Sequence, residues 1–194
     1  MRFYPILLVA LAMLAGSAGY ITHRGLAKPP APAPLVTATR SEAPATPASA
    51  ENALDWTFKS LAGPPRALRE WADDVLVVNF WATWCPPCLR EIPAFVALQQ
   101  QYGEQGLQFV GVALDEAAAV KGFVADNDVN YPVLVGDQAV VRFMQQLGND
   151  IGALPYTAVL DHHGEIRYTH QGEWDADEAE ALLLSFMKSP QTSK

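Results

Sequence analysis

Both cysteines of this 194-residue chain lie in one short stretch, residues 81–88, which reads WATWCPPC. Cys85 and Cys88 are separated only by Pro86 and Pro87. Two thiols at this spacing can close a disulfide, exchange it with a disulfide of another protein, or bind a soft metal ion. A loop this short constrains the unfolded chain very little, so a purely structural disulfide is a poor explanation of the pair.

The segments around the motif predict a strand followed by a helix. Residues 75–82, VLVVNFWA, form an uninterrupted apolar run with β-branched members, which is typical of a strand buried on both faces. A helix is expected at residues 86–102. We expect it to be interrupted or kinked at Pro93, because proline cannot donate a hydrogen bond to the Leu89 carbonyl.

The start of this helix is where the cysteine chemistry is expected. Cys85 falls near the N-cap, and Pro86 and Pro87 occupy the first turn, where prolines are tolerated. Pro87 has no amide hydrogen, so the Cys88 N–H is the natural donor to a Cys85 thiolate. This donor and the helix dipole should lower the pKa of Cys85 from about 8.5 toward or below 7. Cys88, one turn inside the helix and less exposed, is suited to resolve a mixed disulfide formed at Cys85.

Strand and helix patterns alternate through the rest of the chain. Strands are expected at residues 107–114 and 131–136, helices at 116–127 and 138–148, a hairpin at 156–161 and 165–172, and a closing helix at 175–188. Asp175 or Asp177 can cap the closing helix, and the acidic run at 173–180 is interpreted as its solvated start. This order predicts an α/β fold with a mostly parallel central sheet, helices on both faces and antiparallel strands from the hairpin.

The N-terminal part of the chain differs in composition from this domain. Residues 1–26 are interpreted as an uncleaved membrane anchor with its apolar core at 5–21, and a cleaved signal peptide is the alternative. Residues 27–52 contain six prolines among small residues and predict a disordered tether. The globular domain is expected at 53–189, with a tail at 190–194. Either interpretation of the first segment exports the domain.

Charge limits the partners of this domain. Residues 51–194 carry nine Lys and Arg residues against twenty Asp and Glu residues. Such a surface repels phosphate, so we expect no nucleic-acid partner. Nothing in the sequence demands more than a monomer.

Three segments together carry a family resemblance: VVNFWATWCPPCLREIP, GLQFVGVALDE and ALPYTAVLDHHGEI. They resemble the TlpA/ResA group of membrane-associated thioredoxin-like thiol:disulfide oxidoreductases, across residues 52–188. The resemblance implies a thioredoxin fold, with a central mixed β-sheet flanked by helices. It also implies an extra strand–helix insertion before the cis-proline loop, for which residues 131–148 offer room. Pro155 corresponds to the cis-proline that faces the CxxC, and it would expose the Leu154 backbone for pairing with a partner.

The resemblance also draws attention to two polar residues. Asn79 lies six residues before Cys85, where ordinary thioredoxins carry a buried acid, and its side chain cannot titrate. Glu91 follows Cys88 by three residues, about one helical turn. TlpA/ResA-like proteins carry an acid at this position that tunes the cysteines, so Glu91 is the candidate substitute. An exposed helix carboxylate is the alternative interpretation.

Aromatic and histidine residues complete the list of candidates. Trp81 and Trp84 are expected to shape and cover the site. Packing is the preferred interpretation of Trp84, with stacking on a substrate as the alternative. His162 and His163 fall in the hairpin turn and His170 in an edge strand, and all three are interpreted as surface residues.

We therefore predict a thiol:disulfide oxidoreductase that faces the periplasm from the inner membrane, or is soluble there after signal cleavage. It needs no cofactor beyond the Cys85–Cys88 disulfide. The resemblance points to reduction of client proteins with cysteine pairs, as in cytochrome c or copper-site maturation, with electrons from a membrane thiol donor.

Two other functions and a metal site stay open as alternatives. A disulfide-forming oxidase is less favoured, because the chain lacks the long helical insertion of DsbA-like oxidases. A copper-binding thiol chaperone would use the same soft thiolates. A zinc site wants four ligands, and the chain has no second CxxC. We therefore expect no resident metal.

Overall fold

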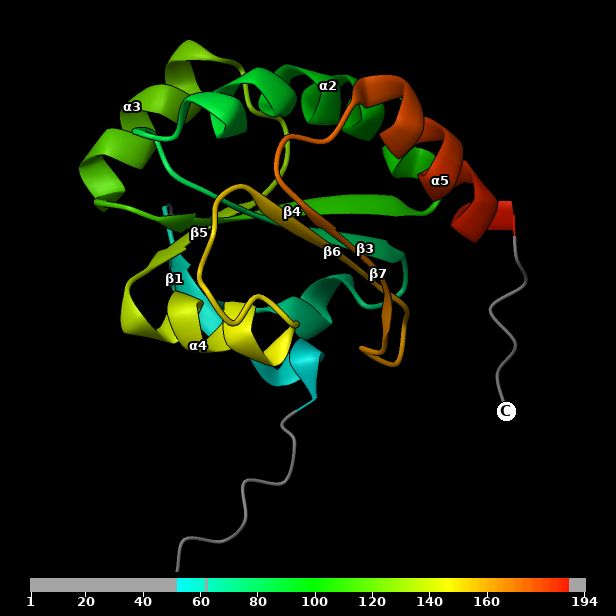
Figure 1. Ribbon diagram of the computed structural model, residues 1–194, viewed down its shortest axis with the longest axis horizontal. Coiled ribbons are helices and arrows are strands. Elements are labelled where there is room, and N and C mark those ends of the chain that lie inside the picture. The colour runs from blue at the N-terminus through cyan, green and yellow to red at the C-terminus, as the bar shows by residue number, and fades with distance from the viewer. Residues whose placement is uncertain (1–51, 62, 189–194) are drawn as a thin grey trace, which may run out of the picture. The chain divides into compact units, whose positions relative to one another are not determined.

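The computed structural model describes residues 52–61 and 63–188, whose layers are shown in Figure 1. Seven strands form one sheet in the order β2-β1-β5-β4-β3-β6-β7. The strands are β1 (Thr57–Ser60), β2 (Arg66–Ala67), β3 (Val75–Trp81), β4 (Leu107–Leu114), β5 (Val133–Gly136), β6 (Tyr156–Leu160) and β7 (Ile166–Gln171). The expected membrane segment at 5–21, the tether at 27–52 apart from Asn52, and the tail at 190–194 lie outside the described residues.

The strand β3 lies inside the sheet between β4 and β6, and it explains why the sheet is mixed. All seven of its residues are buried. It pairs in parallel with β4 and antiparallel with β6, and β4 pairs in parallel with β5. An apolar strand of this kind is stable only when helices cover both faces of its sheet.

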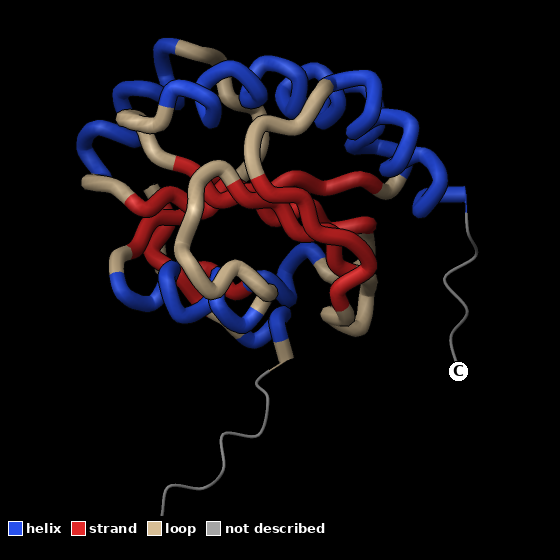
Figure 2. The backbone as a smooth tube through the Cα atoms, viewed as in Figure 1, coloured by secondary structure: helices blue, strands red, loops and turns tan. Residues whose placement is uncertain are grey.

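Helices cover the two faces unequally. They are α2 (Pro86–Tyr102), α3 (Ala117–Asp126), α4 (Gln138–Gln146) and α5 (Ala176–Lys188). Figures 1 and 2 show α2, α3 and α5 over one face of the sheet and α4 against the other. Each face has its own apolar cluster. Within the described part of the chain, no helix is both long and apolar enough to cross a bilayer. The predicted thioredoxin fold is confirmed, with β5 and α4 placed before the proline loop. The expectation of a mostly parallel sheet is wrong, because only β3–β4 and β4–β5 pair in parallel, and β1 and β2 add antiparallel pairings beyond those of the hairpin.

Two local expectations need correction. The helix α2 runs unbroken through Pro93, so the predicted interruption is wrong. One hydrogen bond is lost there, but burial of Ile92, Phe95 and Leu98 holds the helix against the sheet. The acidic run does not simply begin the closing helix, because α5 starts at Ala176 and Glu173 lies outside it.

The edge strands β1 and β2 were not predicted from the sequence. They extend the sheet beyond β5, and the short 3-10 helices η1 (Ala53–Asp55) and η2 (Leu68–Trp71) flank them in the chain. The strands have four and two residues, too few for a recognisable alternation of apolar and polar positions.

Candidate active site at the start of α2

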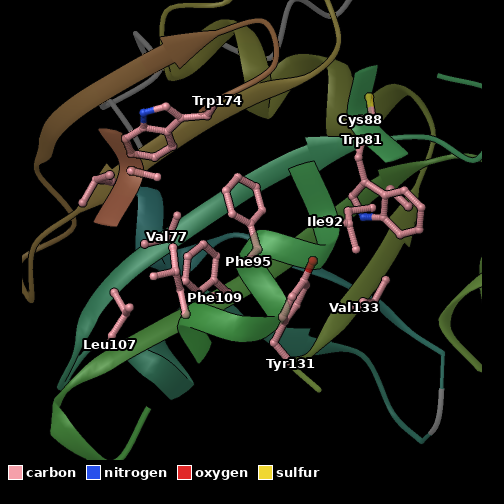
Figure 3. Close-up of a cluster of buried hydrophobic side chains, with 14 of the residues drawn as sticks. Val77, Trp81, Cys88, Ile92, Phe95, Leu107, Phe109, Tyr131, Val133 and Trp174 are labelled. Carbon is pink, nitrogen blue, oxygen red and sulfur yellow. The ribbon is translucent and has the colours of Figure 1, made fainter. Parts of the chain in front are cut away.

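Cys85 and Cys88 form a disulfide, with their Cα atoms 5.3 Å apart. Cys85 is the N-cap of α2, and its carbonyl accepts the Leu89 N–H at 3.2 Å. Cys88 is fully buried, whereas Cys85 keeps 4% of its surface exposed. In Figure 3 the Cys88 sulfur lies at one end of the apolar cluster beneath α2, near Trp81. The strand–loop–helix setting predicted for the motif is therefore present, with the inner cysteine the less accessible one.

A carboxylate from the neighbouring strand anchors the loop between β3 and α2. Asp115, directly after β4, accepts the Thr83 N–H at 2.9 Å and the Thr83 hydroxyl at 2.6 Å through Oδ2. Its Oδ1 accepts the Glu116 N–H at 2.7 Å. Burial raises the pKa of Asp115, but these hydrogen bonds outweigh it and the pKa is lowered. Sequence reasoning missed Asp115, although its place after a strand parallel to β3 is the signal that it lies beside the motif.

The loop before β6 approaches the same end of β3. The Leu154–Pro155 peptide bond is cis, as the resemblance implied. The strand β6 begins at Tyr156, which is paired with Phe80 near the end of β3 that leads into the CxxC motif. Pro155 is buried, and the half-buried Leu154 packs against both apolar clusters. Strand pairing therefore brings the residues before β6 to the cysteine end of the sheet.

Glu91 is buried, with 2% of its surface exposed, so the interpretation as an exposed helix carboxylate is wrong. Its Oε1 accepts a hydrogen bond of 2.8 Å from Asn79 Nδ2, and its Oε2 accepts the Trp174 N–H at 3.0 Å. Burial raises the pKa of Glu91 to about 7, against the opposing effect of the bonds from Trp174 and Asn79. A carboxyl group one turn after Cys88 thus exchanges its proton near neutral pH.

The connection between β7 and α5 joins this carboxyl group to the proline loop. The Gly172 N–H donates to the Pro155 carbonyl at 2.9 Å, and two residues later the Trp174 N–H reaches Glu91. Gly172 has a φ of 93°, a left-handed conformation that glycine adopts without strain. One short loop therefore touches both the cis-proline and the buried acid.

Side chains hold this loop against α2. Arg90 Nε donates to Glu173 Oε2 at 2.8 Å, an ion pair that lowers the pKa of Glu173. The Trp174 ring is buried and lies edge-on to Phe95, with ring centres 6.4 Å apart. The His170 ring also stacks on it, with ring centres 5.3 Å apart. The sequence did not reveal these contacts, because Arg90 and Glu173 are 83 residues apart.

Comparison with known proteins relates this chain to redox proteins that carry out thiol–disulfide exchange. A protein-family model described as Redoxin matches residues 44–183, which is most of the chain. The chain belongs to the Redoxin family. It is 30% identical over 137 residues to the "Thioredoxin-like protein YneN" of Bacillus subtilis, covering 69% of this chain and 77% of that protein. It is 33% identical over 123 residues to the "Thiol-disulfide oxidoreductase ResA" of Halalkalibacterium halodurans, covering 63% and 68%.

A solved structure extends this comparison to the fold. The thioredoxin-family thiol:disulfide interchange protein of Chlorobium tepidum superposes with a TM-score of 0.62 at 25% identity, covering 68% of this chain and 92% of that one. These matches confirm three predictions from the sequence: the resemblance to TlpA/ResA-like proteins, the thioredoxin-like fold and the thiol:disulfide oxidoreductase class.

The two tryptophans of the WATWCPPC stretch differ in environment. Trp81 is buried with 1% of its surface exposed, whereas Trp84 has 64% exposed, directly before Cys85. The preferred interpretation of Trp84 as a packing residue is therefore wrong. An exposed aromatic ring next to the disulfide suits contact with a partner better than contact with the core.

Replacement of Trp84 by alanine should separate these roles. We expect the free energy of unfolding to change by less than about 0.5 kcal/mol, because the ring contributes little to the core. Thiol–disulfide exchange with a folded protein should slow, while exchange with a small disulfide should not. The control is Trp81→Ala, which should cost about 3–5 kcal/mol because that ring is buried. Denaturant unfolding and turnover measure the two quantities, and a large stability loss for Trp84→Ala would restore the packing role.

The three histidines of the hairpin differ in exposure. His163 is exposed, and His162 and His170 are half-buried. The interpretation as surface residues overlooked the stacking of His170 on Trp174. Among residues 52–61 and 63–188, no group of three or more His, Cys, Asp or Glu side chains could hold a metal ion.

Proposed function

We propose that this Redoxin-family chain reduces disulfide bonds of exported client proteins through Cys85 and Cys88. The observation that carries the proposal is a redox-capable cysteine pair at a helix N-terminus with a buried carboxyl group one turn away. That carboxyl group has its pKa raised to about 7 by burial, within reach of ordinary working pH. Structural disulfides need no such proton acceptor.

The reaction begins at Cys85. As the N-cap residue it receives the partial positive charge of the α2 dipole, which favours its thiolate. The thiolate attacks one sulfur of a client disulfide and forms a mixed S–S bond. The client S–S bond breaks, and its second sulfur leaves as a thiolate that takes a proton from water.

Cys88 completes the exchange. It gives its proton to the Glu91 carboxylate and attacks the Cys85 sulfur, which breaks the mixed bond and releases the first client sulfur as a thiolate. That thiolate is then protonated. The client has gained two electrons and two protons, and the enzyme carries the Cys85–Cys88 disulfide that the structure contains.

Client binding is proposed at the rim of the disulfide. The exposed Trp84 ring offers an apolar contact surface next to Cys85. Beside it, the backbone of Leu154 can pair with an extended client segment, in the manner of strand addition. Pro86 and Pro87 fix the spacing of the two sulfurs in the first turn of α2, so that oxidation needs little rearrangement.

The cellular setting is part of the proposal. We place the chain at the inner membrane through residues 5–21, facing the periplasm, as a monomer. Asn52, the first described residue, donates to the His163 carbonyl at 2.6 Å in the β6–β7 turn. This turn is at the opposite end of β6 from the proline loop, so the described domain begins at the end of the sheet away from the cysteines.

A membrane dithiol would return two electrons after each cycle, since the exported compartment is oxidising. Proteins with cysteine pairs awaiting haem or copper are the proposed clients.

The reduction potential tests the direction of the exchange. We expect a value of about −250 mV or lower, measured by equilibration with a thioredoxin of known potential and alkylation of the free thiols. The Cys85→Ser/Cys88→Ser double variant serves as the blank for alkylation. A value near about −120 mV would contradict reduction and favour the disulfide-forming oxidase instead.

A further inference from the structure

Three buried polar side chains meet between β3, α2 and β6. They are Asn79, Glu91 and Thr157, with 1%, 2% and 0% of their surfaces exposed. The Asn79 Nδ2 group donates to Glu91 Oε1 at 2.8 Å and to Thr157 Oγ1 at 3.0 Å. Its Oδ1 is buried without a hydrogen-bond partner among the described residues. An amide that uses one end twice and the other not at all needs an explanation.

The explanation lies in the two protonation states of Glu91. When the carboxyl group is ionised, both oxygens accept: Oε1 from Asn79 and Oε2 from the Trp174 N–H. When the group is neutral, one oxygen carries a proton. A proton on Oε2 would face the Trp174 N–H, a backbone donor that cannot become an acceptor. A proton on Oε1 would face the Asn79 amino group, which is also a donor.

The conflict at Oε1 disappears if the side-chain amide of Asn79 rotates by half a turn about its Cβ–Cγ bond, which exchanges the positions of Oδ1 and Nδ2. The two ends of an amide have nearly the same size, so the turn needs no repacking. Oδ1 then takes the position of Nδ2 and accepts the proton of Glu91. The number of unpartnered ends stays the same: Oδ1 in one orientation and Nδ2 in the other.

We propose that Asn79 is a positioning residue that turns its amide with each protonation and deprotonation of Glu91, and that Thr157 supports both orientations. The Thr157 hydroxyl can do this because it either accepts from Nδ2 or donates to Oδ1. An aspartate in place of Asn79 would add a second ionisable group, whereas the amide adds only a reversible donor and acceptor. This role rests on the proposed function, in which Glu91 takes a proton from Cys88 and returns it.

Other charged and titratable groups lie around Glu91 and affect the pKa at which it exchanges its proton. Glu173 on the β7–α5 loop raises the pKa of Glu91 by its charge, and Arg90 pairs with Glu173. Tyr131, before β5, has its own pKa raised by burial and by Glu91, so it stays neutral. His170 stacks on the ring of Trp174, the residue whose N–H donates to the carboxyl group.

The turn can be observed directly in the oxidised, full-length chain in detergent micelles, where the cysteines do not titrate. We expect nuclear Overhauser contacts between the Asn79 amino protons and Thr157 at about pH 9, and their loss at about pH 5. The loss should follow the titration of the Glu91 carboxyl carbon. Asn149 is the matched control: it is also buried, but Oδ1 accepts the Ala153 N–H and Nδ2 donates to the Ala153 carbonyl. Its contacts should not change with pH.

Variants of Glu91 and Thr157 test the same proposal independently. In Glu91→Gln the new amide satisfies Trp174 with its oxygen and must donate to Asn79 with its nitrogen. We therefore expect Asn79 to be locked in the turned orientation, without contacts between its amino protons and Thr157, at every pH. Thr157→Val should move the Glu91 titration upward, because the ionised state then leaves one Nδ2 hydrogen without an acceptor, whereas in the turned orientation Oδ1 still accepts from Glu91; Thr157→Ser should restore the titration. A purely structural role would lower stability in Thr157→Val without moving the titration.

The proposal is overturned if Glu91 titrates while the Asn79–Thr157 contacts stay constant, or if Glu91 does not titrate between about pH 5 and pH 9. These outcomes differ from a failure of the proposed function. A chain that turns its amide as described but never reduces a client disulfide would keep this inference and refute the enzyme's direction.

Discussion

A Cys88→Ser chain is expected to accumulate client proteins bound covalently to Cys85. The first attack needs only the thiolate at the start of α2, whereas release needs the inner sulfur that serine lacks. Reduction of insulin disulfides should fall to the rate without enzyme. Non-reducing electrophoresis of the exported fraction should show higher-mass species that collapse on addition of a small thiol.

The matched control is Cys85→Ser. Cys88 is fully buried, so it should not reach a client sulfur and should trap nothing. Equal trapping by both variants would contradict the assignment of an outer attacking and an inner resolving cysteine. Absence of trapped partners in Cys88→Ser would argue against exchange with proteins altogether.

Glu91→Gln should make the oxidised protein more stable at pH 8 and a slower enzyme. The pKa of Glu91 is raised to about 7 in the folded chain, above its usual value near 4.5, because burial disfavours the charge. Below about pH 4.5 both folded and unfolded chains carry the proton, and the group costs nothing. As the pH rises to about 7 the unfolded chain ionises first, so this group's contribution to stability is progressively lost.

Above pH 7 the loss is complete and amounts to roughly 3 kcal/mol, since each pKa unit corresponds to about 1.4 kcal/mol. The neutral amide of the Glu91→Gln variant avoids this loss, so the variant should gain up to that amount at pH 8 and little at pH 4. Urea unfolding at the two pH values measures the difference.

The control for this variant is Glu70→Gln, an exposed carboxyl group whose pKa is lowered by its hydrogen bond with Arg66. Its stability effect should have the opposite sign and be small. Turnover gives the second readout: without a proton acceptor near Cys88, Glu91→Gln should lose its rise in rate around neutral pH. A variant that is no more stable at pH 8 than at pH 4, relative to the natural chain, would show that Glu91 is not held as a buried acid.

Long, strongly patterned elements were predictable from the sequence. The buried strand β3, the helix α2 and the position of Cys85 at its N-cap all follow from a continuous apolar run that ends at a CxxC with two prolines. The closing helix α5 is also where its pattern indicates, and of the two candidate caps the structure uses Asp175, whose Oδ1 accepts the Asp177 and Glu178 N–H groups.

Short edges and solvent exposure were not predictable in the same way. The strands β1 and β2 are too short for periodicity, and β1 is held by a partner distant in the chain, β5. The solvent exposure of Trp84 was predicted wrongly. A large aromatic residue beside an apolar strand ordinarily packs in the core, but here the loop turns the ring outward. The interruption expected at Pro93 was also wrong, because tertiary packing of α2 outweighs the lost hydrogen bond.

The place of the sulfur chemistry follows from local sequence, since a helix that begins at Cys85 creates a field that favours a thiolate there. The handling of the proton depends instead on how distant parts of the chain pack together. The pKa of Glu91 depends on burial beneath β3, on an amide from Asn79 and on a backbone donor from Trp174, which lies 83 residues away. Desolvation and hydrogen bonding act over a few ångströms in space, and sequence order does not encode those distances.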